Sequence, residues 1–130
     1  QLEQYVMAKV WDDPDVDVDG VIDEFFRLYF GAAAEPMKRF YLRLEEIACD
    51  PTNYPSPYHR SDGINWKAVA WERLGTAERM AELGALITQA EELAGTETQK
   101  QRVALWRSAI WEWMRQGREQ YLAAQKQNGQ

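Results

Sequence analysis

Residues 12–31 read DDPDVDVDGVIDEFFRLYFG, and this stretch decides how the first part of the chain folds. Asp17 is a residue type that favours helix starts, because its short carboxylate can accept a hydrogen bond from the first turn. Asp19 places negative charge near the positive end of the same helix, and Gly31 suits the backbone turn that ends it. The spacing therefore predicts a helix over residues 18–30, with an apolar face toward the core.

The same stretch also admits a calcium-binding interpretation. Residues 15–20 read DVDVDG and copy the start of an EF-hand loop, in which alternate acids bind the ion. That loop requires a bidentate glutamate at its twelfth position, where this chain has Phe26. Asp23, at the ninth position, usually acts only through water. The structural interpretation is preferred, and a calcium-dependent module at residues 15–23 remains an alternative.

Helical periodicity continues along the whole chain and predicts an all-α fold, a single domain over residues 1–130. Residues 1–49 are expected to form three helices, residues 50–64 a proline-rich loop, and residues 65–125 a helical hairpin region. The result is five to six helices packed as an irregular bundle that ends in a long antiparallel hairpin. The inward positions expected on the last helix are Val103, Trp106, Ala109, Ile110, Trp113, Gly117 and Tyr121.

Composition excludes several classes of protein. Charged residues make up 28% of the chain and apolar residues 45%, as in an ordinary folded domain rather than a disordered one. A net charge of −6 and a pI near 4.8 argue against nucleic-acid binding, and no apolar run has the length of a membrane span. The chain opens with Gln1 inside a helical pattern, so it is expected to be a fragment of a larger protein.

The proline-rich loop contains the best local candidates for ligand contact, namely Tyr54, Tyr58, His59 and Arg60. Long loops inside compact domains are often functional. A structural interpretation is preferred, in which the prolines hold the loop flat and its tyrosines pack onto the helices.

Tryptophan is the compositional outlier, with six in the chain. Trp111 lies roughly 100° from Ile110 around the helix, off the expected inward stripe. Trp71 and Trp11 are similarly hard to place in a core. Exposed tryptophans can stack on sugar rings, or they can mark a surface that another domain covers, and the second interpretation is preferred.

The sequence offers no catalytic, cofactor or metal site. Cys49 and His59 are the single residues of their types, too few for a closed zinc site or a complete nucleophilic triad. No glycine-rich phosphate loop or dinucleotide motif is present. The many acids are expected on solvated helix faces, not in a facing pair of the kind that a glycosidase needs.

Residues 4–45 read QYVMAKVWDDPDVDVDGVIDEFFRLYFGAAAEPMKRFYLRLE and carry a family resemblance. A helix that ends in Trp11, an Asp13-Pro14 turn and the sequence DEFFRLYFG at residues 23–31 make up the pattern. The segment resembles the helical region after the catalytic barrel in a domain-of-unknown-function family of large bacterial glycoside-hydrolase-like proteins. That family looks related to α-glucuronidases and β-N-acetylhexosaminidases. Residues 71–94 and 101–121 also look like its closing helices.

The resemblance implies that this chain is not itself an enzyme, because the barrel and its catalytic acids would lie upstream. It implies a helical accessory domain that braces the barrel, contributes to assembly or forms a homo-oligomer. The location of the protein is left open, and a secreted, periplasmic or cell-surface parent is one option. The alternatives are a glycan- or protein-binding helical module that uses residues 54–60 and an exposed tryptophan, and the calcium-dependent module.

Overall fold

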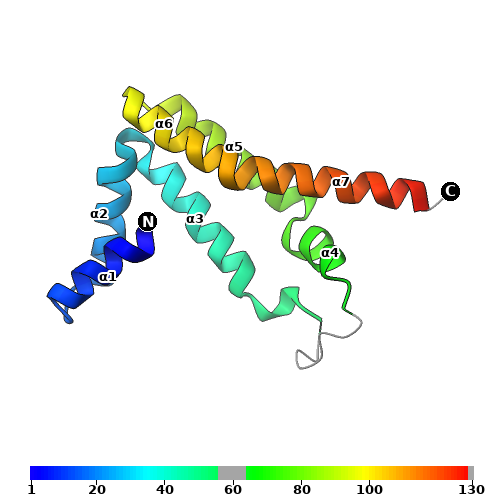
Figure 1. The fold of residues 1–130 in the computed structure, drawn as a ribbon, viewed down its shortest axis with the longest axis horizontal. Helices are drawn as coiled ribbons and strands as arrows, with labels where there is room; N and C mark the ends of the chain where they lie inside the picture. Colours follow the sequence, from blue (N-terminus) through cyan, green and yellow to red (C-terminus); the bar gives the residue numbers. More distant parts are fainter. Residues whose placement is uncertain (56–63, 129–130) are drawn as a thin grey trace.

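The computed structural model describes residues 1–55 and 64–128, and within them every regular element is helical. The all-α prediction is therefore confirmed, and the elements pack as an irregular bundle (Figure 1). The main helices are α1 (Leu2–Asp12), α2 (Val18–Phe30), α3 (Ala34–Cys49), α4 (Trp66–Ala68), α5 (Ala77–Leu93), α6 (Glu97–Trp106) and α7 (Glu112–Asn128). The 3₁₀ turns η1 (Gly31–Ala33) and η2 (Pro51–Asn53) and the π-helical segments η3 (Val69–Leu74) and η4 (Arg107–Trp111) link or extend them.

Helix α2 covers the predicted residues 18–30 without a shift at either end. Asp17 is its N-cap, although its side chain accepts no hydrogen bond from the helix. Gly31 ends α2 with φ = 56°, a backbone angle that favours glycine over residues with a Cβ. The predicted boundaries are thus confirmed, whereas the start of α2 depends on backbone conformation and charge rather than on a side-chain cap.

The core is built mainly where α2, α3 and α5 meet. Phe30 lies against Trp106 of α6 with their rings edge to face and 5.8 Å apart, and Phe26 stacks on Phe30 at the same centroid distance. Burial of one such side chain stabilises a fold by about 1.5–3 kcal/mol. The largest fully buried side chains are Phe26, Phe30, Phe40, Met37, Leu83, Ile87, Val103 and Pro36.

The predicted antiparallel hairpin is formed by α5 and the long rod of α6, η4 and α7 (Figure 1). Thr96 begins the rod with a capping box, in which its hydroxyl accepts a hydrogen bond from the Gln99 backbone. The Gln99 side chain accepts a hydrogen bond from the Thr96 backbone in return. Figure 1 shows α7 continuing past the other helices to the C-terminal end.

The predicted buried face of the rod formed by α6, η4 and α7 was partly wrong. Trp113 and Ala109 were expected to point inward, but both are exposed, Trp113 by 69%. Trp111 was expected off the inward stripe, but it is buried, with 8% of its surface exposed. The reason is η4, because a π-helical turn inserts one extra residue and rotates the side chains after it by roughly 100°.

The first helical segment after the proline-rich loop is α4, which continues into the π-helical η3. Asn65 caps its start by accepting a hydrogen bond from the Ala68 backbone at 3.1 Å, and the segment ends at Gly75. Figure 1 shows this element between the end of α3 and α7. No helix in the described part of the chain is both long enough and apolar enough to cross a membrane.

Candidate functional site

The most distinctive cavity is an apolar pocket of about 310 Å³ bounded by α3, η3, α5 and α7. Its volume lies at the small end of the range for ligand pockets, about 300–1,000 Å³. The residues that line it are Leu44, Ile47, Ala48, Ala70, Trp71, Leu74, Gly75, Leu83, Trp113 and Met114. We refer to it as the Trp71–Trp113 pocket. Its walls come from segments far apart in the sequence, so helix packing builds it rather than a single loop.

Trp71 forms one wall of this pocket and packs closely against the backbone of Gly117. A Cβ at Gly117 would lie 2.5 Å from Cζ2 of Trp71, so only glycine lets the indole approach the α7 backbone there. On the other side of this contact lies a smaller pocket of about 200 Å³ that also includes Trp71. The sequence prediction singled out Trp71 as hard to place in a core, and the structure leaves it half-buried between two pockets.

Trp113 forms the opposite rim. Its ring centroid lies 6.4 Å from that of Trp71, with the two ring planes tilted by 50°. Most of the Trp113 surface faces solvent, although the side chain lines the pocket. Sequence reasoning missed this residue, because an uninterrupted α-helix would have placed it in the core.

One arginine contacts a residue of the pocket wall, and a second is linked to the wall through Asn53. Arg118 Nε donates a hydrogen bond to the Gly75 carbonyl at 2.9 Å. Arg79 Nη1 donates to Asn53 Oδ1 at 3.0 Å, and the Asn53 amide donates to the Ile47 carbonyl at 2.8 Å. Gly75 and Ile47 both line the pocket, so positive charge lies close to its apolar surface.

The candidates predicted in the proline-rich loop divide into two groups. Tyr54 donates a hydrogen bond from its hydroxyl to the Ala48 carbonyl at 2.6 Å, which fits a tyrosine packed onto α3. Tyr58, His59 and Arg60 lie outside the described residues. Trp111, which with Trp71 was a predicted interface residue, is buried against α5 with 8% of its surface exposed.

The geometry of residues 15–23 does not support the calcium-loop hypothesis. Helix α2 begins at Val18, so Asp19 and Asp23 lie on a helix and cannot wrap around an ion as residues of a loop would. Asp23 forms an ion pair with Lys38 of α3. No group of three acidic, histidine or cysteine side chains in the described part of the chain is arranged to hold a metal ion.

A polar cluster joins α1 to α2 on the outside of the bundle. Glu24 accepts a hydrogen bond from Tyr5 and pairs with Lys9 at 2.9 Å. The Tyr5 hydrogen bond, followed by the Lys9 hydrogen bond and charge, lowers the pKa of Glu24 below its ordinary value. The same hydrogen bond raises the pKa of Tyr5, and the contact with Glu24 raises the pKa of Lys9. These shifts come from a surface contact between helices, which makes the cluster structural.

No family model matches this chain, and no curated protein or solved structure matches it. The description of the pocket therefore depends only on the residues of this chain. It is an apolar pocket with two indoles, edged by arginines and open to solvent at Trp113.

Proposed function

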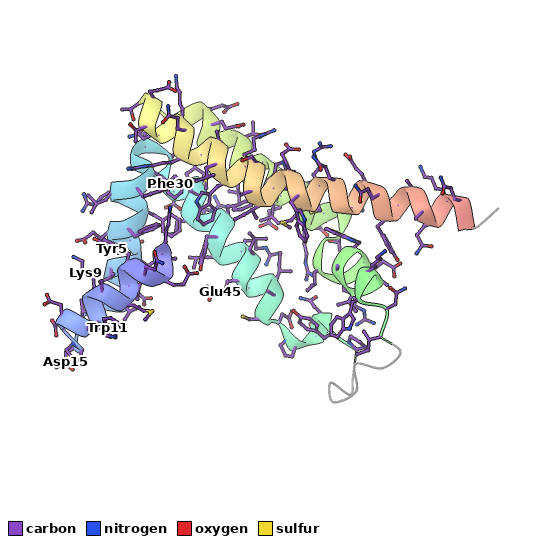
Figure 2. All side chains as sticks on the ribbon, viewed as in Figure 1. Tyr5, Lys9, Trp11, Asp15, Phe30 and Glu45 are labelled. Carbon is purple, nitrogen blue, oxygen red and sulfur yellow. The ribbon has the colours of Figure 1, made fainter. Side chains whose placement is uncertain are left out.

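We propose that this chain is a non-catalytic helical accessory domain of a glycoside-hydrolase-like, carbohydrate-active protein. In this account it packs against the catalytic barrel of the same protein through the corner between α1 and α2. The observation that carries the proposal is Trp11, which is 80% exposed at the end of α1 (Figure 2).

The surface around Trp11 supports a docking role. Met7 lies one helical turn earlier on the same face and is 50% exposed, and Val18 at the start of α2 is 42% exposed. Tryptophan is enriched among the side chains that dominate binding energy at protein interfaces. The corner also belongs to residues 4–45, the segment that carries the family resemblance.

Charged side chains support the non-catalytic part of the proposal. Several acids of the bundle pair with cations on helix surfaces, as Glu82 does with Arg43 at 3.0 Å and Glu112 with Arg115 at 2.8 Å. Catalytic carboxylates instead tend to lie in clefts, where burial and neighbouring charges shift their pKa values. The main pocket is lined by apolar residues, with no carboxylate among them.

The test is site-specific photo-crosslinking in the native protein. A photoreactive phenylalanine analogue replaces Trp11 in one variant and Leu93 in a matched control, because Leu93 is 44% exposed on the distant α5. Crosslinks from position 11 to peptides of a glycoside-hydrolase-like barrel, without such crosslinks from position 93, are the expected result. Equal reaction at both positions, or none at position 11, would reject the proposed docking corner.

A glycan-binding module is the second candidate, and the smaller pocket next to Trp71 favours it. Lys67, Gln120 and Tyr121 line this pocket together with the indole. An aromatic ring with a few converging polar groups is a common arrangement in ligand sites. Titration of the chain with oligosaccharides, compared with a Gln120→Ala variant, tests this candidate. Binding that the variant weakens would support it, and the absence of binding at millimolar sugar would remove it.

A further inference from the structure

We propose that the Trp71–Trp113 pocket binds a small amphipathic carboxylate. The alkyl body, about seven carbons long, occupies the pocket, and the carboxylate pairs with Arg118. This site is independent of the docking corner at Trp11, so either proposal can fail without the other.

The pocket walls define the apolar half of the ligand. They are formed by aliphatic side chains such as Leu44 and Leu74 together with two indoles. Such a surface gains free energy by excluding water and offers almost no partner to a polar group. The volume of about 310 Å³ equals roughly ten water volumes of about 30 Å³ each, which suits a ligand of about ten heavy atoms.

Arg118 defines the charged half. It follows Met114 of the pocket by one helical turn on α7, so both lie on the same face of the helix. Its Nε is fixed on the Gly75 carbonyl, which holds the half-buried guanidinium beside the pocket wall. Among the described contacts this guanidinium pairs with no carboxylate, although the chain as a whole carries a net charge of −6.

Arg79 is a second positive charge, linked to the α3 side of the pocket. It reaches Ile47 of the pocket through Asn53 and donates a further hydrogen bond to the Arg73 carbonyl. Arg79 forms no ion pair among the described residues, although, after the hydrogen bonds from Thr52, its charge helps to lower the pKa of the Asp50 carboxyl. Arg118 is therefore the arginine assigned to the ligand carboxylate. Charge complementarity therefore favours an anion at this edge of the pocket, and guanidinium groups bind carboxylates strongly.

The experiment is isothermal titration of the full chain with octanoate, hexanoate and 1-octanol. Three variants accompany it: Ala48→Phe, which adds a ring from an exposed position lining the pocket, Trp113→Ala, which removes the exposed rim, and Arg118→Gln. The matched controls are Ala123→Phe on the exposed surface of α7 and Arg39→Gln on the exposed surface of α3. Melting curves establish that each variant is folded.

Octanoate is expected to bind, and hexanoate about fifteenfold more weakly, because it lacks two methylenes and each buried methylene contributes about fourfold. The Ala48→Phe and Trp113→Ala variants should weaken octanoate binding at least fivefold. Arg118→Gln should reduce octanoate binding to the level of 1-octanol and leave 1-octanol unchanged. The controls should match the original chain.

No octanoate binding at millimolar concentration would overturn the site. Binding indifferent to the Ala48 and Trp113 variants would also overturn it, and equal affinities for octanoate and 1-octanol would overturn the contact with Arg118.

Discussion

The indole of Trp111 lies so close to the backbone of Gly84 that a Cβ on Gly84 would be 2.9 Å from Cζ2 of the ring. This contact joins the terminal rod to α5 and exists because the π-helical η4 turns Trp111 inward. A glycine in the middle of a helix normally weakens it, so its presence at position 84 reflects the space that the indole needs.

Gly84→Ala is expected to destabilise the fold by about 1–3 kcal/mol, since the added methyl group would force a buried ring to move. This effect opposes the usual gain of about 1 kcal/mol when alanine replaces glycine inside a helix. The measurement is the free energy of unfolding in urea.

Gly20→Ala is the matched control, because Gly20 also lies inside a helix with a neighbour at a similar distance. Its neighbour is the flexible, exposed carboxylate of Asp17, 2.8 Å from the added Cβ, which can rotate away. We expect this variant to be unchanged or stabilised by up to about 1 kcal/mol. Equal destabilisation by both variants would contradict the role assigned to Trp111.

Deletion of Ser108 should leave the chain folded. Ser108 is exposed within η4, and its removal lets the wide turn close as an ordinary α-helical turn. Trp111 and the residues after it then keep their positions, so the free energy of unfolding should change by about 1 kcal/mol or less.

Deletion of Gln101 is the comparison for the π-helical turn. Gln101 is also exposed, but it lies in the regular helix α6. Its loss would rotate the flanking helical segments by roughly 100° relative to each other and displace Trp106 or Val103 from the core. A loss above about 3 kcal/mol is expected. If both deletions lower the free energy of unfolding equally, the conclusion that η4 contains one extra residue is wrong.

Most of the fold could be predicted because local signals agree with the packing. Helix α2 has acids at its start and a glycine with positive φ at its end, and both boundaries were correct. The capping box at Thr96 was likewise readable from residue type and spacing alone. These signals depend on residues that are close together in the sequence, so they can be recognised without the structure.

The candidate site could be predicted only in part. Trp71 was recognised as unusual, but Trp113 was assigned to the core and Trp111 to the surface, the reverse of their positions. A uniform period of 3.6 residues cannot represent the extra residue in η4. The pairing of Gly84 with Trp111 and of Gly117 with Trp71 depends on segments far apart in the chain, so the sequence alone did not reveal it.

The two helix caps should differ in energy. Thr96→Ala removes a hydroxyl that accepts a hydrogen bond from the Gln99 backbone at 3.2 Å, and should cost about 1 kcal/mol. Asp17→Ala removes an N-cap whose side chain makes no such bond, and should cost less than half as much. Thermal melts of both variants give the comparison, and a larger loss at Asp17 would contradict it.

Acid should weaken the contact between α1 and α2. The pKa of Glu24 is lower in the folded chain than its ordinary value, so the stabilisation is complete above the unfolded pKa, about 4.3. It is lost as the pH falls through the lower folded pKa. Glu24→Gln should therefore melt below the original chain at neutral pH, and the difference should shrink in acid.

Glu92→Gln is the control for this acid titration, because Glu92 is exposed on α5 and belongs to no ion pair of the described part. Its melting temperature should track the original chain across the whole pH range. A gap between Glu24→Gln and the original chain that stays constant down to strong acid would show that the carboxylate does not contribute through its charge.

The accessory-domain account is tested most directly by the intact mass of the native protein that contains this segment. An antibody raised against the chain would isolate that protein from source cells for mass measurement. The account predicts a mass several times larger than the 15.1 kDa of this chain, with barrel peptides in its digest. A native product of 15.1 kDa would contradict it and make the Trp71–Trp113 pocket the leading functional site.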